Sequence, residues 1–281
     1  MPELPEVETV MRGLQPHMEG ALIERVEQRR ADLRFPFPDK FVTRLQGAEV
    51  HHLSRRAKYV LVGLSTGEIL VMHLGMSGRF LVNGQEESPH DHVVFYLSNG
   101  DVVTYNDPRR FGYMALVEAA AFDEHKFFTA LGPEPLGNQF HADLLAAKAR
   151  GKKTALKNFL LDQRVVAGLG NIYVLEALHM VGLHPERRAA DLVTKAGKPR
   201  KVAHDLVAAI REVLGQAIAS GGSTLKDYAK ADGSMGYFQH SFQVYGREGQ
   251  ACLRPNCSGE IARIVQSGRS SFFCPVCQKR A

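Results

Sequence analysis

The sequence predicts an α+β protein that begins with a helix and an antiparallel β-sandwich, continues as a helical domain and ends in a small cysteine-bearing hairpin. Three observations support this prediction. Between Gly20 and Leu116, β-rich segments alternate with turn residues and no helix is interposed. Beyond Leu131 the hydrophobic pattern becomes helical, and all four cysteines lie close to the C-terminus. Strands that are followed by helices, rather than alternating with them, are typical of α+β proteins.

The composition is that of an ordinary globular chain. The 281 residues are 44% hydrophobic and 23% charged, which argues against extensive disorder and against a disulfide-dense miniprotein. The longest apolar stretch, 165–183, is interrupted by polar residues such as Glu176, so it falls short of the ~18 apolar residues of a membrane span. The N-terminus lacks the basic and apolar regions of a secretory signal. We therefore expect a cytosolic protein that does not associate with membranes.

Residues 5–15 have the pattern of a short amphipathic helix. Apolar residues recur at helical spacing from Val7 to Leu14. Pro5 suits the first position of a helix, where its missing N–H is not needed. Pro16 predicts that the helix ends soon after Leu14.

Four segments between residues 58 and 105 are predicted strands. Those at 58–64 and 68–74 are joined across a Ser-Thr-Gly turn, and those at 93–97 and 102–105 flank Asn99-Gly100. An Asn-Gly dipeptide between β-rich segments is a strong hairpin signal. Successive hairpins predict antiparallel sheets that pack as a sandwich.

Four helices are predicted in the middle of the chain, where apolar residues recur at helical spacing. They cover residues 142–149, 154–161, 171–181 and 201–220. A Gly-Gly-Ser turn and a glycine-containing loop follow the last of them.

The cysteines form two close pairs. Cys252 and Cys257 are spaced C-x4-C, and after sixteen residues Cys274 and Cys277 are spaced C-x2-C. Four thiolates in this pattern can hold one tetrahedral zinc ion, and the β-rich segments between the pairs could form the hairpin of a zinc ribbon. Two disulfides or a redox-active Cys-Pro-Val-Cys are the alternatives, which a cytosolic setting disfavours. We predict one structural zinc ion, because four protein ligands leave no open position for catalysis.

Positive charge is concentrated in two places. The chain carries 35 Lys and Arg against 30 Asp and Glu, a net charge of +5, and its pI is near 9.0. From Ser241 onward basic residues clearly outnumber acidic ones, and the basic residues between Lys148 and Lys157 have no acid among them. Such clusters suit a polyanion such as nucleic acid, because neutralised phosphates release counterions. The alternative is two solvated faces.

Gly168-Leu-Gly-Asn171 invites a comparison with dinucleotide-binding loops. The third glycine of that fingerprint is replaced by Tyr173, and no βαβ unit surrounds it. A tight turn between two helices, with Asn171 as the cap of the second, is the better interpretation. The helix N-terminus could bind a phosphate, or the turn could serve packing alone.

Pro2 follows the initiator methionine, and a small second residue favours removal of Met1. The secondary amine could then attack an aldehydic or glycosidic carbon and form an iminium, with the adjacent Glu3 donating or accepting a proton. For an arbitrary protein, a solvated chain end would be the simpler explanation.

Nine motifs stand in the order in which one enzyme family has them: MPELPEVE at 1–8, RRAKY at 55–59, HLGMSG at 73–78, NDPRRFG at 106–112, LGPEPL at 131–136, GLGNIY at 168–173, GGSTLKD at 221–227, VYGR at 244–247 and the cysteine tail. Through them the chain resembles bacterial formamidopyrimidine-DNA glycosylases, the Fpg or MutM family, which remove oxidised purines such as 8-oxoguanine from DNA. The resemblance covers essentially the whole chain.

The resemblance implies a fold, a division into domains and an activity. The fold is expected to be α+β, with an N-terminal helix and antiparallel β-sandwich, a helical helix–two-turn–helix domain and a terminal zinc-ribbon β-hairpin. The catalytic domain, the DNA-binding domain and the zinc finger are expected at 1–130, 131–240 and 241–281. The implied activity is base-excision DNA repair by a bifunctional glycosylase and AP lyase. It excises 8-oxoguanine and formamidopyrimidines through a Schiff base and cleaves the strand by β,δ-elimination.

The resemblance also implies catalytic roles, residue by residue. Pro2 resembles the nucleophile that attacks C1′ of the damaged nucleotide, and Glu3 resembles the acid that protonates the sugar ring oxygen. Lys58 resembles the lysine assigned to proton transfer in β-elimination; without the family it would be a charge at a strand edge. Arg269 resembles the zinc-finger arginine that contacts the phosphates flanking the lesion and is associated with δ-elimination.

Further positions match residues that bind the DNA. Met76, Arg109 and Phe111 match the side chains that fill the void left by the everted base, and Arg109 would bind the orphaned partner base, preferably cytosine. The family's DNA-backbone contacts match His90, Lys152, Lys153, Lys157 and Asn171. Residues 221–237 match the mobile loop that closes over the everted base.

The C-x4-C spacing departs from the C-x2-C expected in many relatives, and Arg254 and Pro255 would enlarge that knuckle. Two other functions stay open: an endonuclease VIII-like glycosylase for oxidised pyrimidines, and a DNA-binding protein without activity. The PELPE opening argues against the first alternative, and the combination of Pro2, Glu3 and Lys58 argues against the second. The expected partner is double-stranded DNA with damaged bases, bound by a monomer in the bacterial cytosol at the nucleoid.

Overall fold

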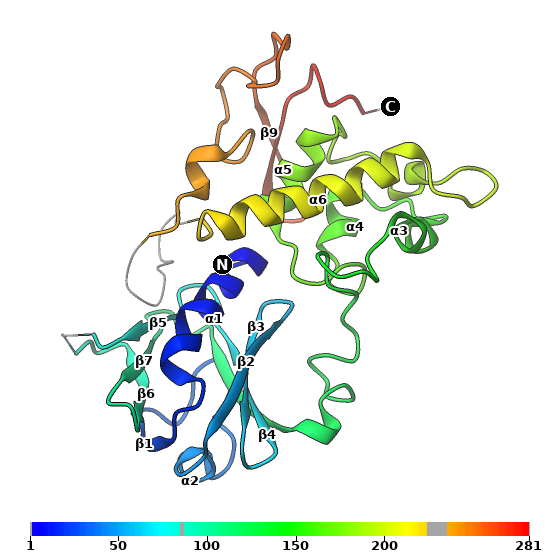
Figure 1. Ribbon diagram of the computed structural model, residues 1–281. Helices are drawn as coiled ribbons and strands as arrows, with labels where there is room; N and C mark the ends of the chain where they lie inside the picture. The colour runs from blue at the N-terminus through cyan, green and yellow to red at the C-terminus, as the bar shows by residue number, and fades with distance from the viewer. Residues whose placement is uncertain (1, 85–86, 224–234, 281) are drawn as a thin grey trace. The chain divides into compact units, whose positions relative to one another are not determined.

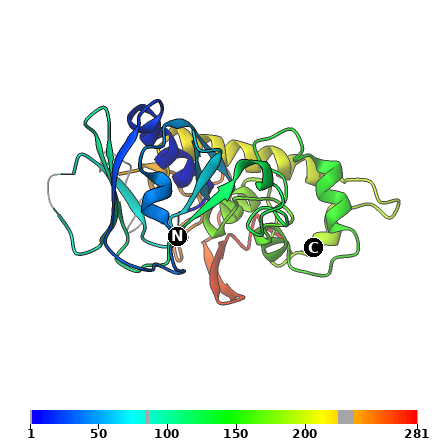
Figure 2. The same ribbon diagram turned by 90° about the horizontal axis from the view of Figure 1, so that it is seen from below.

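The computed structural model describes residues 2–84, 87–223 and 235–280. The chain divides into two compact units, which can be followed by colour in Figure 1 and from below in Figure 2. The first unit comprises Met1–Thr129 and Ala217–Gln239, and the second comprises Ala130–Gln216 and His240–Ala281. The first unit is therefore discontinuous in sequence, and the cysteine tail belongs to the same unit as the helices before it.

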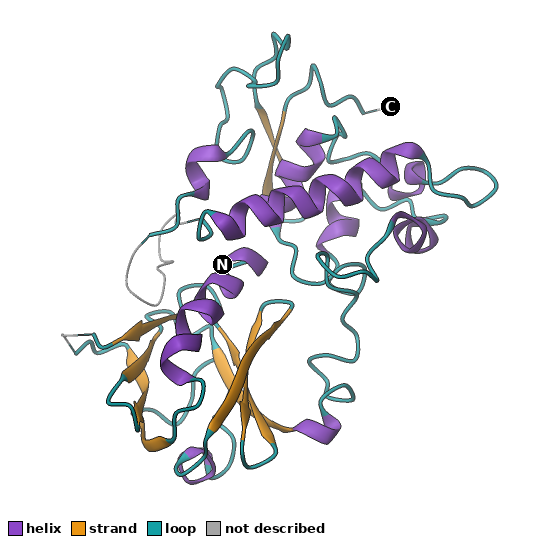
Figure 3. Ribbon diagram, viewed as in Figure 1, coloured by secondary structure: helices purple, strands orange, loops and turns teal. Residues whose placement is uncertain are grey.

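Two four-stranded antiparallel sheets form most of the first unit (Figure 3). Their strand orders are β1-β6-β7-β5 and β2-β3-β4-β8. The bounds are α1 Leu4–Met18, β1 Ile23–Gln28, α2 Phe41–Leu45, β2 Val50–Arg56, β3 Tyr59–Leu64, β4 Glu68–His73, β5 Arg79–Val82, β6 Asp91–Leu97, β7 Val102–Asn106, β8 Tyr113–Glu118 and the 3-10 turn Ala119–Ala121. The β3–β4 and β6–β7 pairs confirm the two predicted hairpins.

One cluster of buried apolar side chains is shared by α1 and both sheets, as expected for a sandwich. From α1 it takes Val10 and Leu14, from one sheet Phe95, and from the other Val60 and Val62, all fully buried. Burying an aliphatic or aromatic side chain of this kind contributes roughly 1.5–3 kcal/mol relative to leaving it exposed. This core fixes α1 on the sheets and thereby fixes where the N-terminal residues lie.

Helix α1 is longer than predicted. It continues past Pro16 to Met18, and the backbone N–H of Glu19 still bonds to Gln15 O at 3.0 Å. A proline at this position loses the bond that its own N–H would have made, and its ring crowds the carbonyl four residues earlier. Because Leu14 and Met18 are both fully buried, packing outweighs that loss.

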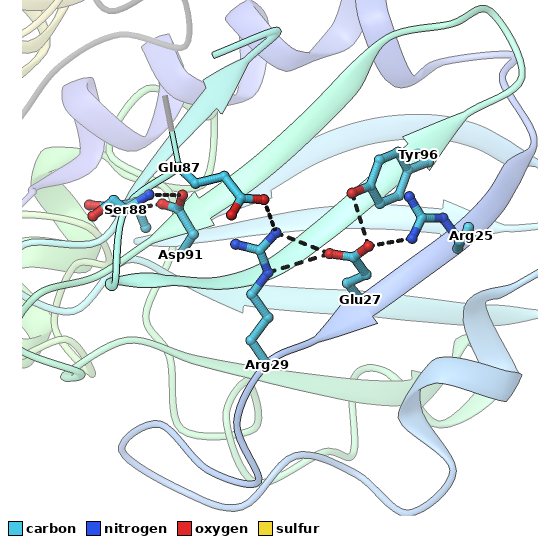
Figure 4. Close-up of polar contacts among 8 residues, drawn as sticks. Arg25, Glu27, Arg29, Glu87, Ser88, Asp91 and Tyr96 are labelled. Carbon is cyan, nitrogen blue, oxygen red and sulfur yellow. Dashed lines mark hydrogen bonds and ion pairs between the residues drawn. The ribbon is translucent and has the colours of Figure 1, made fainter. Parts of the chain in front are cut away.

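Ion pairs and hydrogen bonds cover part of the outer side of the β1-containing sheet (Figure 4). Arg29 lies 3.0 Å from both Glu27 and Glu87, and the Tyr96 hydroxyl donates to Glu27 at 3.0 Å. The hydrogen bond from Arg29 is the largest influence on Glu27 and lowers the pKa of that carboxyl. Exposed pairs of this kind add little stability. They keep this side of the sheet polar.

The remaining elements are mostly helical and include the four predicted helices, whose ends differ from the prediction by at most two residues. Their bounds are α3 Ala142–Ala149, α4 Leu156–Leu161, α5 Asn171–Met180, α6 Lys201–Ala219, β9 Ala262–Gln266 and β10 Arg269–Phe273, with 3-10 turns at Ala189–Leu192 and Phe238–Ser241. Strands β9 and β10 pair antiparallel, which confirms the hairpin between the cysteine pairs. None of the helices in the described ranges has the length and apolarity needed to cross a bilayer.

Candidate active site and zinc site

The N-terminal residues are held by a capping box. Glu3 is the N-cap of α1 and only 4% exposed. Its backbone N–H donates to Glu6 Oε2 at 2.8 Å, and its carboxylate accepts from the backbone N–H of Glu6. Pro2, directly before it, is buried. The capping box therefore fixes the direction in which Pro2 and Glu3 enter the helix.

Glu6 also ties α1 to a distant segment of the same unit. Its Oε1 accepts the backbone N–H of Ser223 at 2.8 Å, and Ser223 pairs with Tyr237 in a β-bridge. A Cβ on Gly222 would lie 3.1 Å from Glu6 Cγ, and the φ of Gly222 is +78°, so this position favours glycine. Both described ends of the predicted 221–237 loop thus meet next to α1, whereas residues 224–234 lie outside the described residues.

Lys58 lies in the two-residue turn between β2 and β3, where the φ of Ala57 is 52°. The lysine is 8% exposed. It lies close enough to His73 to affect that imidazole: burial, followed by the charges of Lys58 and Arg34, lowers the pKa of His73 to about 4. His73 is therefore neutral at physiological pH.

Arg55 connects this turn to α1. Its Nε donates to Glu8 Oε2 at 2.8 Å and its Nη1 donates to the carbonyl of Ala57 at 2.9 Å. The Arg55 side chain is 8% exposed, so both bonds are shielded from water. Arg55 thus links the carbonyl of the residue before Lys58 to α1, the helix that Pro2 and Glu3 directly precede. Neither Arg55 nor Glu6 was predicted to be a site residue; the Glu-x-x-Glu spacing of the capping box was the available signal for Glu6.

The predicted void-filling residues lie on two loops that Asp107 holds together. The buried Asp107 carboxylate accepts from Ser77 Oγ at 2.6 Å and from the backbone N–H of Gly112 at 2.8 Å. Between these anchors the exposed Arg109 places its guanidinium 4.9 Å from the ring centre of Phe111, which is 45% exposed. Met76, next to Ser77, is partly exposed.

His90 belongs to the same region of the first unit. Its carbonyl accepts the backbone N–H of Asp107 at 3.0 Å, and its side chain is exposed. The structure therefore brings four of the predicted DNA-contacting residues together around the turn that begins at Asp107.

Arg269 lies at the tip of the β9–β10 hairpin in the second unit. The turn consists of Ser267 and Gly268, with φ of 48° and 73°. Positive φ at both positions is the signature of a type I′ turn, which suits the right-handed twist of two strands. Arg269 follows this turn directly and is exposed. The hairpin therefore presents a guanidinium at its tip.

The same hairpin contacts two helices through its serines. Lys157 Nζ donates to Ser271 Oγ at 2.6 Å, and Asn171 Nδ2 donates to the carbonyl of Ser270 at 2.9 Å. Lys157 comes from α4 and Asn171 begins α5. Three of the predicted DNA contacts, Arg269, Lys157 and Asn171, are thus gathered at one hairpin.

Lys157 differs from its neighbours in the basic cluster. Lys152 and Lys153 are exposed, whereas Lys157 has no exposed surface. Burial, followed by the charge of Arg269, lowers the pKa of Lys157 to about 8. Its charge therefore varies within an accessible pH range.

Asn171 is not the helix cap that the sequence suggested. Gly170 is the N-cap, Asn171 is the first helical residue, and its side chain turns to Ser270 instead. Its Oδ1 is buried and has no hydrogen-bond partner among the described residues.

The four cysteines meet at one point of the second unit. Their sulfurs all lie within 4.8 Å of one another, and none is in a disulfide. Cys252 and Cys277 are 3.8 Å apart, and Cys257 and Cys274 are 3.6 Å apart. Zn–S bonds of about 2.3 Å in a tetrahedron place sulfurs about 3.8 Å apart. The residues therefore fit one structural zinc ion, which would supply folding energy to this small hairpin.

Comparison with known families matches all three regions of the chain. Residues 1–114 match the formamidopyrimidine-DNA glycosylase N-terminal domain, residues 131–229 match its H2TH domain, and residues 249–280 match the zinc finger found in FPG and IleRS.

Individual relatives match over the full length. A formamidopyrimidine-DNA glycosylase of Ruegeria pomeroyi is 55% identical over 289 residues, covering 99% of this chain and all of the relative. Two crystal structures of the Lactococcus lactis enzyme are 34% identical, each covering 99% of this chain and all of that one. One is a point mutant with Fapy-dG-containing DNA (TM-score 0.88), and the other is the wild type with DNA containing an oxidised pyrimidine (TM-score 0.86). The chain therefore belongs to the formamidopyrimidine-DNA glycosylase family.

Proposed function

We propose that this protein acts in base-excision repair as a DNA glycosylase for oxidised purines, and that it also cleaves the strand at the resulting abasic site. The family membership over the whole chain is the observation that carries the glycosylase activity. The lyase activity rests on the local arrangement: Pro2 and Glu3 at a capped helix start, and Lys58 on a hairpin that Arg55 ties to that helix.

Pro2 is the proposed nucleophile. Once Met1 is removed, its secondary amine attacks C1′ of the damaged nucleotide, and the base leaves as the C1′–N bond breaks. Glu3, 4% exposed at the N-cap of α1, is the proposed acid that protonates the ring oxygen of the sugar as it opens. The product is an iminium between Pro2 and C1′.

The iminium acidifies the C2′ proton, and elimination of the 3′ phosphate follows. Lys58 is the proposed proton-transfer group: its unprotonated amine takes the C2′ proton as the C3′–O bond to the 3′ phosphate breaks. Arg269 at the tip of the β9–β10 hairpin is proposed to bind the phosphates flanking the lesion and to assist loss of the 5′ phosphate. Together, β- and δ-elimination release the remaining sugar and leave a one-nucleoside gap with phosphates on both sides.

The proposed DNA-contacting residues come from both units and have two roles, filling the space of the everted base and binding the phosphate backbone. On the first unit, Met76, Arg109 and Phe111 are proposed to fill the space of the everted base, with Arg109 hydrogen-bonded to the orphaned partner. We propose that the phosphate backbone is bound by His90, Lys152, Lys153, Lys157 and Asn171. The zinc ion takes no part in the chemistry; its four cysteines hold the hairpin that carries Arg269.

The proposed substrate is double-stranded DNA that contains a damaged base. We propose that the protein binds it as a monomer and acts in the cytosol, where bacterial chromosomal DNA is found. We further propose that residues 1–130, 131–240 and 241–281 serve as catalytic, DNA-binding and zinc-finger parts. A second candidate, action on oxidised pyrimidines, is supported by the similar structure that contains such a lesion.

Borohydride trapping tests the proposed chemistry and the lesion preference together. One duplex would carry 8-oxoguanine opposite cytosine, and a second would carry an oxidised thymine. Trapping of the first duplex that is lost in Pro2→Gly would support the Pro2 iminium and the purine preference. Trapping mainly of the second would move the substrate to pyrimidines. Absence of trapping on both, with Pro2 verified as the N-terminus, would contradict the proposal.

Any residue left before Pro2 is expected to abolish base excision, because the secondary amine becomes an amide and loses its nucleophilicity. Binding to a duplex with a stable abasic analogue should persist. Intact mass defines the N-terminus, and a strand-cleavage gel with a parallel binding titration measures the two properties. Full excision by protein that retains Met1 would rule out the Pro2 assignment.

A further inference from the structure

The zinc site has a neighbour outside its four ligands. His179, in the last turn of α5, is buried at 3% exposure. Its Nε2 lies 3.4 Å from Cys252 Sγ and 3.9 Å from Cys277 Sγ, both within N–H···S hydrogen-bonding distance.

Zinc binding decides the direction of this hydrogen bond. A cysteine that binds zinc is a thiolate, which carries no proton and can only accept. The hydrogen must therefore come from the imidazole, in the tautomer that is protonated at Nε2. Donation of this kind withdraws negative charge from the sulfur, which makes the thiolate a weaker nucleophile.

The longer knuckle of this chain holds the end of α5 that carries His179. Arg254, one of the two extra residues of the C-x4-C spacing, donates to the carbonyls of His179 and Met180, the latter at 3.0 Å. A positive side chain at these orphan carbonyls is favourable at a helix C-terminus. Gly182, with φ of +71°, then reverses the chain, and a Cβ there would lie 3.3 Å from Arg254 Nη1.

The rest of α5 is attached to the same tail. The Glu176 carboxylate accepts three consecutive backbone N–H groups, from Gln243, Val244 and Tyr245, at 2.8–3.1 Å. Asn171, at the start of the helix, bonds to Ser270 in the hairpin. Helix α5 is therefore fixed to the tail at both ends and in the middle, so that the imidazole of His179 has little freedom to leave Cys252.

We infer that His179 is a positioning residue of the zinc site, which donates a hydrogen bond from Nε2 to the zinc-bound thiolate of Cys252 and, more weakly, to Cys277. The bond stabilises the zinc–thiolate pair and protects Cys252 from electrophiles. Removing a hydrogen-bond partner of a metal ligand typically costs about tenfold or more in metal affinity.

Two substitutions and one control test this role in the full-length protein. His179→Phe keeps a ring but removes the donor, and His179→Gln keeps an N–H near the position of Nε2. His184→Phe is the matched control, because His184 is also buried, packs against Phe273 at 4.3 Å between ring centres, and makes no hydrogen bond to a cysteine among the described residues.

Two readouts respond to the thiolate itself. The first is the 113Cd NMR signal of cadmium-exchanged protein, which depends on charge at the sulfurs. The second is alkylation of Cys252 by iodoacetamide in the zinc-loaded protein, followed by mass spectrometry, with zinc affinity measured by chelator competition. For His179→Phe we expect a shifted cadmium signal, faster alkylation at Cys252 and about tenfold weaker zinc binding. His179→Gln and His184→Phe should stay near wild type.

Several outcomes would overturn the inference. An unchanged cadmium signal and alkylation rate in His179→Phe would do so, and so would equal defects in the Phe and Gln variants, which would indicate packing alone. If a variant does not fold, the wild type still decides: a long-range 1H–15N spectrum of the zinc-loaded protein must show His179 protonated at Nε2, and an Nδ1-protonated ring refutes the bond. No measurement involves a lesion, so these results are independent of the proposed repair activity.

Discussion

At the scale of single residues, the proposed active site depends on carboxylates and guanidiniums that do not themselves react. Glu6 bonds to the backbone of both Glu3 and Ser223, and Arg55 bonds to Glu8 and to the carbonyl before Lys58. The Glu6 contacts are buried and the Arg55 contacts are partly buried, so each has few alternative partners and helps to orient a proposed reacting group.

Arg55→Met is expected to slow strand cleavage more than base loss. The variant frees the Ala57–Lys58 turn, and displacement of a reacting group by about 1 Å can cost roughly a hundredfold in rate. Pre-steady-state gels that separate base release from strand scission would measure both steps.

Arg12→Met is the matched control for that variant. Arg12 bonds to the same Glu8 at 2.7 Å, but it is 60% exposed and has no bond to the turn among the described residues. Both steps should stay near wild type in Arg12→Met. Equal slowing of base loss and scission in Arg55→Met would argue that Arg55 serves stability rather than the placement of Lys58.

At the scale of elements, the β9–β10 hairpin and α4 bring two basic side chains of the second unit together. Arg269 is exposed at the hairpin tip, and Lys157 lies beneath it in contact with Ser271. Burial and, after it, repulsion by the charge of Arg269 lower the pKa of Lys157 to about 8. A bound phosphate would relieve that repulsion.

DNA affinity is therefore expected to fall between pH 7 and pH 9 as Lys157 loses its proton. Lys157→Met should bind DNA more weakly than wild type at pH 7. Its DNA affinity should also decrease less between pH 7 and pH 9, because it has no lysine at this position to lose a proton. Fluorescence anisotropy on a duplex with an abasic analogue would measure it, with Lys153→Met as a control that keeps the pH dependence. An identical pH profile in Lys157→Met would contradict a role for this charge in DNA binding.

The lowered pKa of Lys157 affects folding in the opposite direction: DNA affinity is expected to fall as pH rises, whereas the stability of the fold is expected to increase. The pKa of Lys157 is about 8 in the folded protein, compared with 10.5 as its ordinary value. Between these values the unfolded chain binds more protons than the folded one, so this group favours folding increasingly as pH rises through that window.

Periodicity and turn chemistry predicted most of these elements, because they are local properties of the chain. The Asn99-Gly100 hairpin and the helix at 142–149 follow directly from such signals. The predicted end of α1 was wrong because the burial of Met18 outweighed the helix-breaking effect of Pro16. The prediction of Asn171 as a helix cap was wrong because its side-chain amide bonds to a hairpin far away in sequence. The same limit hid His179, since nothing local marks a histidine whose partner lies 73 residues later.

At the scale of the whole molecule, the tail and the helices before it belong to one compact unit, which includes the four cysteines. Helix α5 bonds to the tail through Asn171 and Glu176, and the tail carries Arg269. Loss of the metal should therefore affect more than the cysteines themselves.

Removing zinc is expected to abolish tight DNA binding, because the hairpin that presents Arg269 loses the ion that stabilises its fold. The measurement is a binding titration before and after chelation, with metal content determined by elemental analysis. Binding should return on addition of zinc. Unchanged affinity in protein verified as metal-free would show that the hairpin holds its place without the ion.

The discontinuous first unit has a consequence for the order of events on the ribosome. The strands that form its core are complete once Glu118 has been synthesised, but Ser223, whose backbone N–H donates to Glu6, emerges about a hundred residues later. At bacterial elongation rates that delay is roughly 5–20 s. During this interval α1 and the strands are available to fold, but the hydrogen bond from Ser223 to Glu6 cannot yet form. The surroundings of the N-terminal residues are therefore completed late in synthesis.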